Sequence, residues 1–167
     1  MPPLLVRSRC CARVGRSWRP VHLFTYGTLI FPEVMHAVTG RRFESRAGVL
    51  RGYRRSMLRG RVYPGIRPAA ADSTEGRVYL WIDAAALACL DAFEGDEYER
   101  RAVAVGVEGG TLRAEAYVVR AAEFALMTDE RWDSARFAAT HLRPYVDRCR
   151  RLRVARAVSA DLSRGGA

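Results

Sequence analysis

The 167-residue chain contains no lysine, no asparagine and no glutamine, so all 28 of its basic residues are arginine. Against 18 acidic residues, they leave a formal net charge of +10 at pH 7. Together with abundant alanine and glycine, this bias is typical of base-composition drift in a GC-rich genome rather than of selection for phosphate contacts. The excess of positive charge also lies toward the two ends of the chain, because residues 61–140 hold nine arginines against 14 acidic residues. The composition therefore favours a solvated basic surface, with nucleic-acid binding as the less favoured alternative.

The chain also lacks the patterns of several functional classes. No apolar run approaches the ~20 residues of a membrane span. The three histidines stand at no metal-ligand spacing, and no nucleophile elbow, Walker loop or dinucleotide fingerprint is present. These absences argue against a metal, a bound cofactor and a membrane partner. The cysteines form no CxxC pair or zinc spacing, which fits a reducing, cytoplasmic setting; they are Cys10, Cys11, Cys89 and Cys149.

The composition suits one ordinary domain, since 49% of the residues are hydrophobic, enough for a core at this length. Residues 1–20 hold five arginines, no acidic residue and only a three-residue apolar run, so we expect them to lie outside the domain. The favoured explanations for these residues are a disordered extension or a translation start assigned too far upstream. An organellar targeting segment is the weaker alternative. We expect the domain to span residues 21–156, and residues 157–167 to form a flexible tail.

Hydrophobic periodicity and turn residues predict a mixed α/β (α+β) domain whose strands mostly do not alternate with helices. Residues 75–82 are apolar on both faces, as in an interior strand. Pro144 is expected to kink a long last helix. The remaining elements are a strand over 21–26, a short helix from Phe31-Pro32 to about Thr39, two strands or one bent strand over 46–66, a helix from Asp83 to Gly95, a hairpin of residues 98–107 and 112–120 around Gly109-Gly110, and the last helix from Ser134 to about Arg156.

The helix after Asp83 carries an unusual carboxylate. Asp83 is a good N-cap, and Gly95 suits the left-handed residue that closes a helix. At 100° per residue, the apolar side chains of this helix cover one continuous arc, with Glu94 inside it and Asp91 just outside. Glu94 also lies in the last turn, where the helix dipole disfavours negative charge. Either the helix frays before Glu94, which then reaches water, or the carboxylate has a function on the buried side.

Residues 27–29 follow the first strand and precede a helix start. A loop of this kind presents free backbone amides, which suit an anionic or oxyanionic group. Most such loops bind nothing, and Gly27 is equally compatible with a simple turn that needs a positive φ. The loop alone therefore leaves both interpretations open.

Three motifs follow one another along the chain: Tyr26-Gly27-Thr28-Leu29, then Gly60-Arg61-Val62-Tyr63-Pro64-Gly65-Ile66, then Leu90-Asp91-Ala92-Phe93-Glu94-Gly95 running to Tyr98-Glu99-Arg100. In this order and spacing they resemble the signature of the γ-glutamylcyclotransferase-like superfamily. The branch they are most similar to is the plant and bacterial one named for an avirulence-induced gene. The similarity extends to Trp132-Asp133 and to the aromatic spacing of the last helix, so it covers residues 21–152.

The resemblance implies a small mixed β-barrel flanked by helices. It also implies that the first motif holds the glutamyl group of a small-molecule substrate through its backbone, and that the glutamate of the third motif is the catalytic acid/base. The site residues expected on this basis are Tyr26, Gly27, Thr28 and Leu29 for the substrate, Glu94 for catalysis, and Tyr63, Pro64 and Tyr98 for the pocket wall.

The implied activity is cofactor-free release of 5-oxoproline and an amine or amino acid from a γ-glutamyl amide, by an enzyme of the amidine/amide-lyase or acyltransferase class. The α-amine of such a substrate can itself attack the γ-carbonyl and close a five-membered lactam. Well-oriented intramolecular attack reaches effective molarities of ~10⁵–10⁸ M, so one proton-transferring carboxylate can suffice. A pKa raised toward ~6–7 by burial would suit Glu94 to this task. The alternatives are a non-catalytic γ-glutamyl or small-anion binding module on the same fold, and an arginine-rich nucleic-acid-associated protein.

Overall fold

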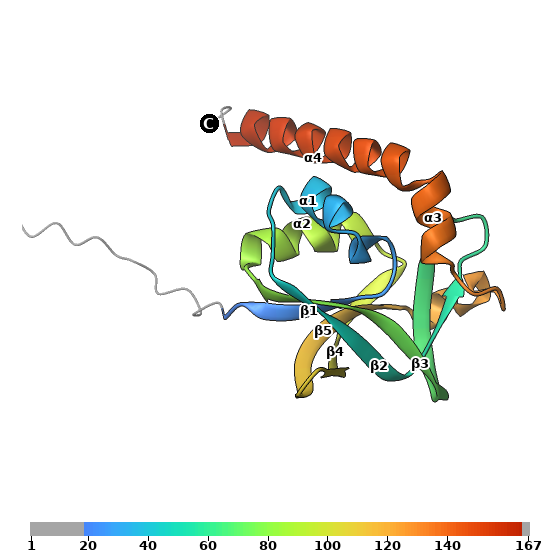
Figure 1. Ribbon diagram of the computed structural model, residues 1–167. Coiled ribbons are helices and arrows are strands. Elements are labelled where there is room, and N and C mark those ends of the chain that lie inside the picture. The colour runs from blue at the N-terminus through green and yellow to red at the C-terminus, as the bar shows by residue number, and fades with distance from the viewer. Residues whose placement is uncertain (1–18, 165–167) are drawn as a thin grey trace, which may run out of the picture.

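The computed structural model describes residues 19–164, which form a closed five-stranded barrel with helices packed on one side (Figure 1). Neighbouring strands follow the order β1-β3-β2-β4-β5. All pairs are antiparallel except β1 and β5, which run parallel to each other. The strands are β1 (Val21–Thr25), β2 (Ser45–Met57), β3 (Pro64–Ile82), β4 (Tyr98–Val107) and β5 (Gly110–Val119). The prediction of a small mixed barrel, and of the hairpin that forms β4 and β5, is confirmed.

Four α-helices and two short 3₁₀ helices complete the described part of the chain. In Figure 1, α1 and α2 lie between the barrel and α4, and α4 crosses over them. The helices are η1 (Thr28–Ile30), α1 (Pro32–Thr39), α2 (Ala84–Glu94), η2 (Ala121–Leu126), α3 (Ser134–Thr140) and α4 (Leu142–Arg164).

Strand β3 contributes to two hydrophobic cores, one within the barrel and one between the barrel and the helices. Val78 and Leu80 belong to the first core, whereas Tyr79 and Ile82 belong to the second. All four are at most 6% exposed. The prediction of an interior strand with two buried faces is therefore confirmed for residues 78–80 and 82, whereas Trp81 in the same stretch is 63% exposed.

Helix α2 begins and ends where the sequence predicts. Asp83 Oδ1 accepts a 3.0 Å hydrogen bond from the Ala86 amide at its start, and Gly95 closes it with a φ of 72°. Glu94 is the last helical residue. The alternative in which the helix frays before Glu94 is therefore wrong.

The strand pattern between residues 46 and 66 resolves into two strands rather than one bent strand. β2 ends at Met57, and β3 pairs with it in antiparallel register from Pro64 onward. β3 is also longer than predicted, because residues 67–74 continue it directly into the apolar strand at 75–82. Alanine, proline and polar residues have little intrinsic strand preference. Pairing with β2 supplies the conformation that local preference does not.

The last helix, predicted over residues 134–156, is two helices. α3 ends at Thr140, His141 departs from helical geometry with a φ of −121°, and α4 begins at the next residue. Pro144 has no N–H to donate to the Thr140 carbonyl, so the helical hydrogen-bond ladder cannot continue across this point. The expected kink is thus a complete break.

Helix α4 also runs further than predicted, since the flexible tail expected beyond Arg156 is helical as far as Arg164. Two of its arginines contact the C-terminal ends of other helices. Arg153 Nε donates to the Ala37 carbonyl of α1 at 3.0 Å, and Arg156 Nη2 donates to the Ala92 carbonyl of α2 at 2.7 Å. Arginine side chains interact favourably with the C-terminal carbonyl groups of helices, where the helix dipole is negative. The periodicity of the sequence does not predict such contacts.

The basic extension predicted for residues 1–20 lies outside the described residues except for Arg19 and Pro20. Within residues 19–164, no helix combines the length and the apolar character that crossing a membrane requires.

Candidate active site

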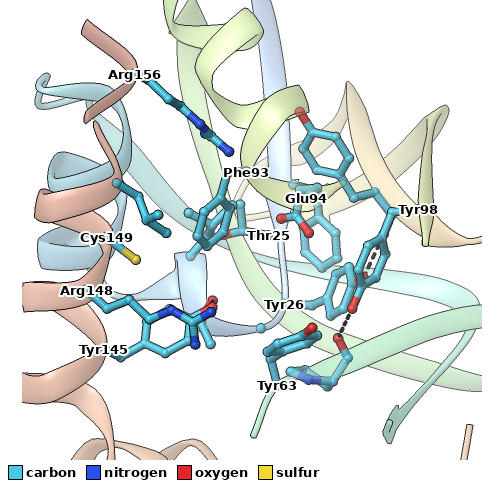
Figure 2. Close-up of a pocket in the computed structure, with 17 residues that line it drawn as sticks. Thr25, Tyr26, Tyr63, Phe93, Glu94, Tyr98, Tyr145, Arg148, Cys149 and Arg156 are labelled. Carbon is cyan, nitrogen blue, oxygen red and sulfur yellow. Dashed lines mark hydrogen bonds between the residues drawn. The ribbon is translucent and has the colours of Figure 1, made fainter. Parts of the chain in front are cut away.

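A cavity of about 170 Å³ opens where the end of β1, the last turn of α2 and one face of α4 meet (Figure 2). It is smaller than the roughly 300–1,000 Å³ of typical drug-sized ligand sites, so it suits a group about the size of one amino acid. All eight site residues predicted from the sequence line this cavity: Tyr26, Gly27, Thr28, Leu29, Tyr63, Pro64, Glu94 and Tyr98.

The loop after β1 is fixed by hydrogen bonds to its carbonyl groups. The Tyr79 hydroxyl donates to the Leu29 carbonyl at 2.9 Å, and the Gly27 and Thr28 carbonyls accept from amides three residues further on. The amides of Gly27, Thr28 and Leu29 stand at the start of η1, where helical amides have no carbonyl partner within their own helix. They are therefore the donors that the loop can offer to a group in the cavity.

Gly27 does not have the positive φ that a simple turn would require. Its φ is −113°, so that alternative is wrong. A Cβ atom at this position would lie 3.0 Å from Pro64 Cδ and 3.1 Å from Pro64 Cγ, which is tighter than nearly all real contacts. A side chain at this position would displace the loop or the Pro64 ring, because the glycine backbone passes directly against that ring in the cavity wall.

Glu94 is a partly buried residue whose side chain lies at the centre of the cavity lining (Figure 2). Desolvation by burial raises the pKa of its carboxyl group to about 8. The described residues supply no hydrogen bond that offsets this desolvation. The carboxyl group is therefore mostly protonated at neutral pH, and near pH 8 it can both give and take a proton.

Five tyrosines line the cavity around Glu94, and the hydroxyl of each has another partner. Tyr26 donates to the Tyr117 carbonyl at 2.7 Å. Tyr98 donates to the Pro64 carbonyl at 3.0 Å. Because hydrogen bonds to the charged form lower a carboxyl pKa, these other partners leave the desolvation of Glu94 uncompensated. Tyr63 donates to Glu97 at 3.5 Å and Tyr117 donates to Asp91 at 2.8 Å, whereas the Tyr145 hydroxyl accepts from Thr28 at 3.5 Å.

Comparison with known proteins agrees with this arrangement. The profile of the family described as "Gamma-glutamyl cyclotransferase, AIG2-like" matches residues 23–134, which is more than half of the chain. The chain belongs to this family. The matched range contains all three sequence motifs and Trp132-Asp133, so the resemblance to the γ-glutamylcyclotransferase-like superfamily and its AIG2 branch is confirmed.

Individual relatives of the AIG2-like family support the same assignment. AIG2-like protein C of Arabidopsis thaliana is 39% identical over 98 residues, which are 58% of this chain and 57% of that protein. The chain thus spans little more than half the length of several curated relatives that it matches. An Arabidopsis thaliana protein solved in solution is 28% identical, with a TM-score of 0.62 over 83% of this chain and 86% of that one. A solved structure named gamma-glutamyl cyclotransferase shares the fold, at 18% identity and a TM-score of 0.54 over 60% of this chain and 66% of that one.

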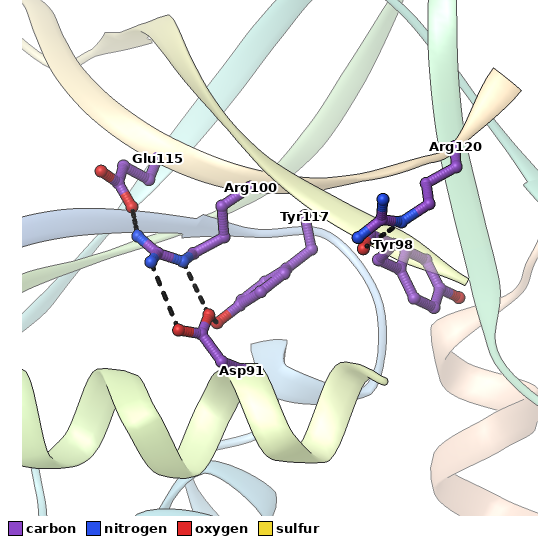
Figure 3. A network of polar contacts seen from close by, with 6 residues as sticks. All are labelled: Asp91, Tyr98, Arg100, Glu115, Tyr117 and Arg120. Atoms are coloured by element: carbon purple, nitrogen blue, oxygen red, sulfur yellow. Dashed lines mark hydrogen bonds and ion pairs between the residues drawn. The ribbon is translucent and has the colours of Figure 1, made fainter. Parts of the chain in front are cut away.

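A polar network, which the AIG2-like motifs do not predict, holds the last turn of α2 against β4 and β5 (Figure 3). The Asp91 carboxylate accepts from Arg100 Nε at 2.6 Å and from the Tyr117 hydroxyl at 2.8 Å. Arg100 also pairs with Glu115. Asp91 stands one helical turn before Glu94, so the network fixes the part of α2 that carries Glu94. Its partners lie nine and 26 residues away along the chain, beyond the reach of helical periodicity.

One wall of the cavity comes from α4 and is not predicted from the sequence. The aromatic spacing predicts a buried face, on which Phe137 and Cys149 are indeed buried, whereas Leu152 is 44% exposed at the cavity. His141 is partly buried, and its ring lies tilted against the Phe137 ring with 5.9 Å between the ring centres. Periodicity indicates that a face is covered, but not that it ends at a cavity. The lining residues that sequence analysis missed are Phe24, Thr25, Phe93, Tyr117, Tyr145, Arg148, Cys149, Leu152 and Arg156.

Cys149 is the thiol of this lining. Burial raises the pKa of Cys149 to about 11, so the thiol stays protonated at neutral pH and is a poor nucleophile. Among residues 19–164, no group of three or more His, Cys, Asp and Glu side chains is arranged to hold a metal ion.

Proposed function

We propose that the chain is a γ-glutamylcyclotransferase that converts a γ-glutamyl amide into 5-oxoproline and a free amine or amino acid. The observation that carries this proposal is the Glu94 carboxyl group, which is desolvated and faces a cavity sized for one glutamyl group. Membership in the Gamma-glutamyl cyclotransferase, AIG2-like family supports the reaction class.

The raised pKa of Glu94 suits the proton transfer that this reaction needs. A free α-amine has a pKa of about 8, and an ordinary glutamate near ~4.3 would take its proton at a cost of about 5 kcal/mol. With the pKa of Glu94 at about 8, that cost nearly disappears. A pure binding module would gain nothing from such a group, because a neutral carboxyl attracts a charged ligand only weakly.

In the proposed reaction, the ionised form of Glu94, which is about half populated near pH 8, first takes one proton from the α-ammonium group of the substrate. The freed nitrogen attacks the γ-carbonyl carbon, so the lactam C–N bond forms and the carbonyl oxygen becomes negative. Glu94 then gives its proton to the departing nitrogen as the original amide bond breaks. The second proton of the attacking nitrogen follows through Glu94 to the released amine, which leaves as an ammonium ion. No water is consumed.

The loop after β1 has the complementary task of holding the substrate. The amides of Gly27, Thr28 and Leu29 belong to residues that line the cavity, and backbone donors at a helix start favour a carboxylate. We assign them to the glutamyl group. A fixed glutamyl group keeps the α-amine within reach of its own γ-carbonyl, and this orientation can supply roughly 7–11 kcal/mol of the barrier.

The decisive experiment is to incubate the protein with a panel of γ-glutamyl amides and measure the release of 5-oxoproline. Release by the wild-type chain that is lost in Glu94→Gln would support the proposal. Binding of these amides without release by the wild-type chain would instead identify a binding module. If the wild-type chain neither binds nor cleaves any amide of the panel, the assignment of the cavity to γ-glutamyl groups is overturned.

A further inference from the structure

Arg55 of β2 is a partly buried arginine that reaches the loop after β1 from outside the cavity. Its Nη1 atom donates to the Tyr26 carbonyl at 2.8 Å and to the Glu75 carbonyl at 3.3 Å. Tyr26 follows the last residue of β1, and the pairing of β1 with β3 ends at Thr25. The guanidinium group thus binds a backbone carbonyl that the sheet no longer holds.

The guanidinium group of Arg55 also lies over the ring of Trp132, in a cation–π contact. Arg55 Cζ lies 5.4 Å from the centre of the Trp132 ring. The indole is 5% exposed, and its Nε1 atom donates to the Val62 carbonyl at 3.1 Å. A buried and hydrogen-bonded indole is a rigid surface for a planar cation to stack on. Trp132, which the family resemblance includes without a role, therefore has one as the support of Arg55.

The Tyr26 carbonyl and the Gly27 amide are the two ends of one planar peptide unit. A cation that binds the oxygen holds the plane of this unit in one orientation. It also polarises the unit, which makes the N–H group at the other end a stronger donor. Gly27 lines the cavity, whereas Arg55 lines a separate polar pocket behind the loop. The hydrogen-bonded path from Arg55 to a ligand in the cavity therefore runs through this peptide.

We infer that Arg55, held by Trp132, is a positioning residue that sets the direction and donor strength of the Gly27 amide toward the glutamyl group. This inference rests on the proposed function, in which the loop amides hold the substrate. It predicts an effect on substrate binding rather than on proton transfer, because Arg55 has no contact with Glu94 among the described residues.

The test compares Arg55→Met with Arg54→Met in the full chain. Methionine keeps much of the length of the arginine side chain but removes its charge and donors. In Arg55→Met we expect the KM for a γ-glutamyl amide to rise about tenfold, as for the loss of one charge-assisted hydrogen bond, while kcat changes less than twofold. Arg55→Lys keeps a charge without the planar fork, so it should recover part of the loss. Arg54 pairs with the exposed Asp129 at 3.7 Å, and Arg54→Met should change neither constant.

A role in stability alone would give a different result. It would lower the folded fraction, so the apparent kcat would fall together with the melting temperature while KM stayed constant, and that outcome would overturn the inference. The amide proton resonance of Gly27 reports on the peptide without any turnover: it should move upfield in Arg55→Met and stay in place in Arg54→Met. An unmoved resonance in Arg55→Met would also overturn the inference. If the wild-type chain releases no 5-oxoproline, the proposed function fails, and the Gly27 resonance still decides the role of Arg55.

Discussion

At the scale of single residues, Glu94 links stability to pH in an unusual direction. Its carboxyl group titrates at about pH 8 in the folded protein and near the ordinary value of 4.5 in the unfolded chain. Between these values the folded chain keeps a proton that the unfolded chain has released, so stability falls as the pH rises. Below the unfolded pKa both states are protonated and this cost is absent, whereas above about pH 8 the cost is complete. Such costs are typical of groups kept for catalysis.

The Glu94→Gln variant should therefore be more stable than the wild type, by an amount that depends on pH. Glutamine keeps the shape of the side chain but does not titrate. The difference in melting temperature should be small near pH ~5, grow toward pH ~8 and then level off. Thermal unfolding across this range measures it, with Glu108→Gln in the exposed hairpin turn as the matched control. A difference that is the same at every pH would mean that Glu94 is not desolvated.

The same variant should lose turnover while it gains stability. Glutamine cannot exchange a proton with the α-ammonium group, so kcat should fall by ~10²–10⁴-fold. The measurement is the rate of 5-oxoproline release at saturating γ-glutamyl amide. Glu108→Gln should keep the wild-type rate. Asp91→Asn is a poor control despite its position outside the apolar arc, because Asp91 binds Arg100 and Tyr117. Near-wild-type release by Glu94→Gln would contradict the assignment.

At the scale of elements, the site is a junction between the start of η1 and the end of α2. Gly27 approaches the Pro64 ring, and the Pro64 carbonyl accepts from Tyr98 just after α2. The loop and the helix end are thus connected through the first residue of β3. A displacement of Pro64 would therefore shift both the loop at Gly27 and the Tyr98 side chain.

Gly27→Ala should accordingly impair activity more than stability. The new methyl group would meet Pro64 at about 3.0 Å, so either the loop or the proline ring must move. We expect kcat/KM for a γ-glutamyl amide to fall at least about tenfold, since a small misplacement of binding groups is costly. Thr28→Ser and Thr28→Ala keep the amide and should be milder. If activity falls only in proportion to the melting temperature in all three variants, the loop is scaffold rather than a binding element.

At the scale of the whole molecule, α4 completes both the core and the cavity. Val146 and Cys149 are buried in the core between the barrel and the helices, and Tyr145 lines the cavity. Arg153 and Arg156 bind the C-terminal ends of α1 and α2. Every described residue that lines the cavity lies between Phe24 and Arg156.

A chain of residues 19–157 should therefore fold and keep its turnover. A chain that ends at Thr140 should not unfold cooperatively, because it loses the buried side chains of α4 and leaves α1 without its cover. Thermal unfolding followed by circular dichroism, together with 5-oxoproline release, measures both. Loss of folding in residues 19–157 would place a required part of the domain outside that range.

The features that the sequence by itself determined are those set by residues close together in the chain. The cap of Asp83, the closing Gly95, the hairpin at residues 98–119 and the two buried faces of residues 75–82 all follow from local hydrogen bonds and side-chain periodicity. The motif spacing likewise led to the family and to all eight predicted lining residues. The length of β3 escaped prediction, because a paired strand rather than local preference stabilises it.

Only the tertiary structure decided how strongly Glu94 is desolvated and what surrounds it. The pKa of about 8 arises because segments around Tyr26, Tyr63 and Tyr117 exclude water from the same carboxyl group and direct their hydroxyls to other acceptors. The contact of Arg55 with the Tyr26 carbonyl spans 29 positions in the same way. Desolvation and contacts of this kind depend on which distant segments the closed barrel brings together, and no local pattern in the chain encodes which segments those are.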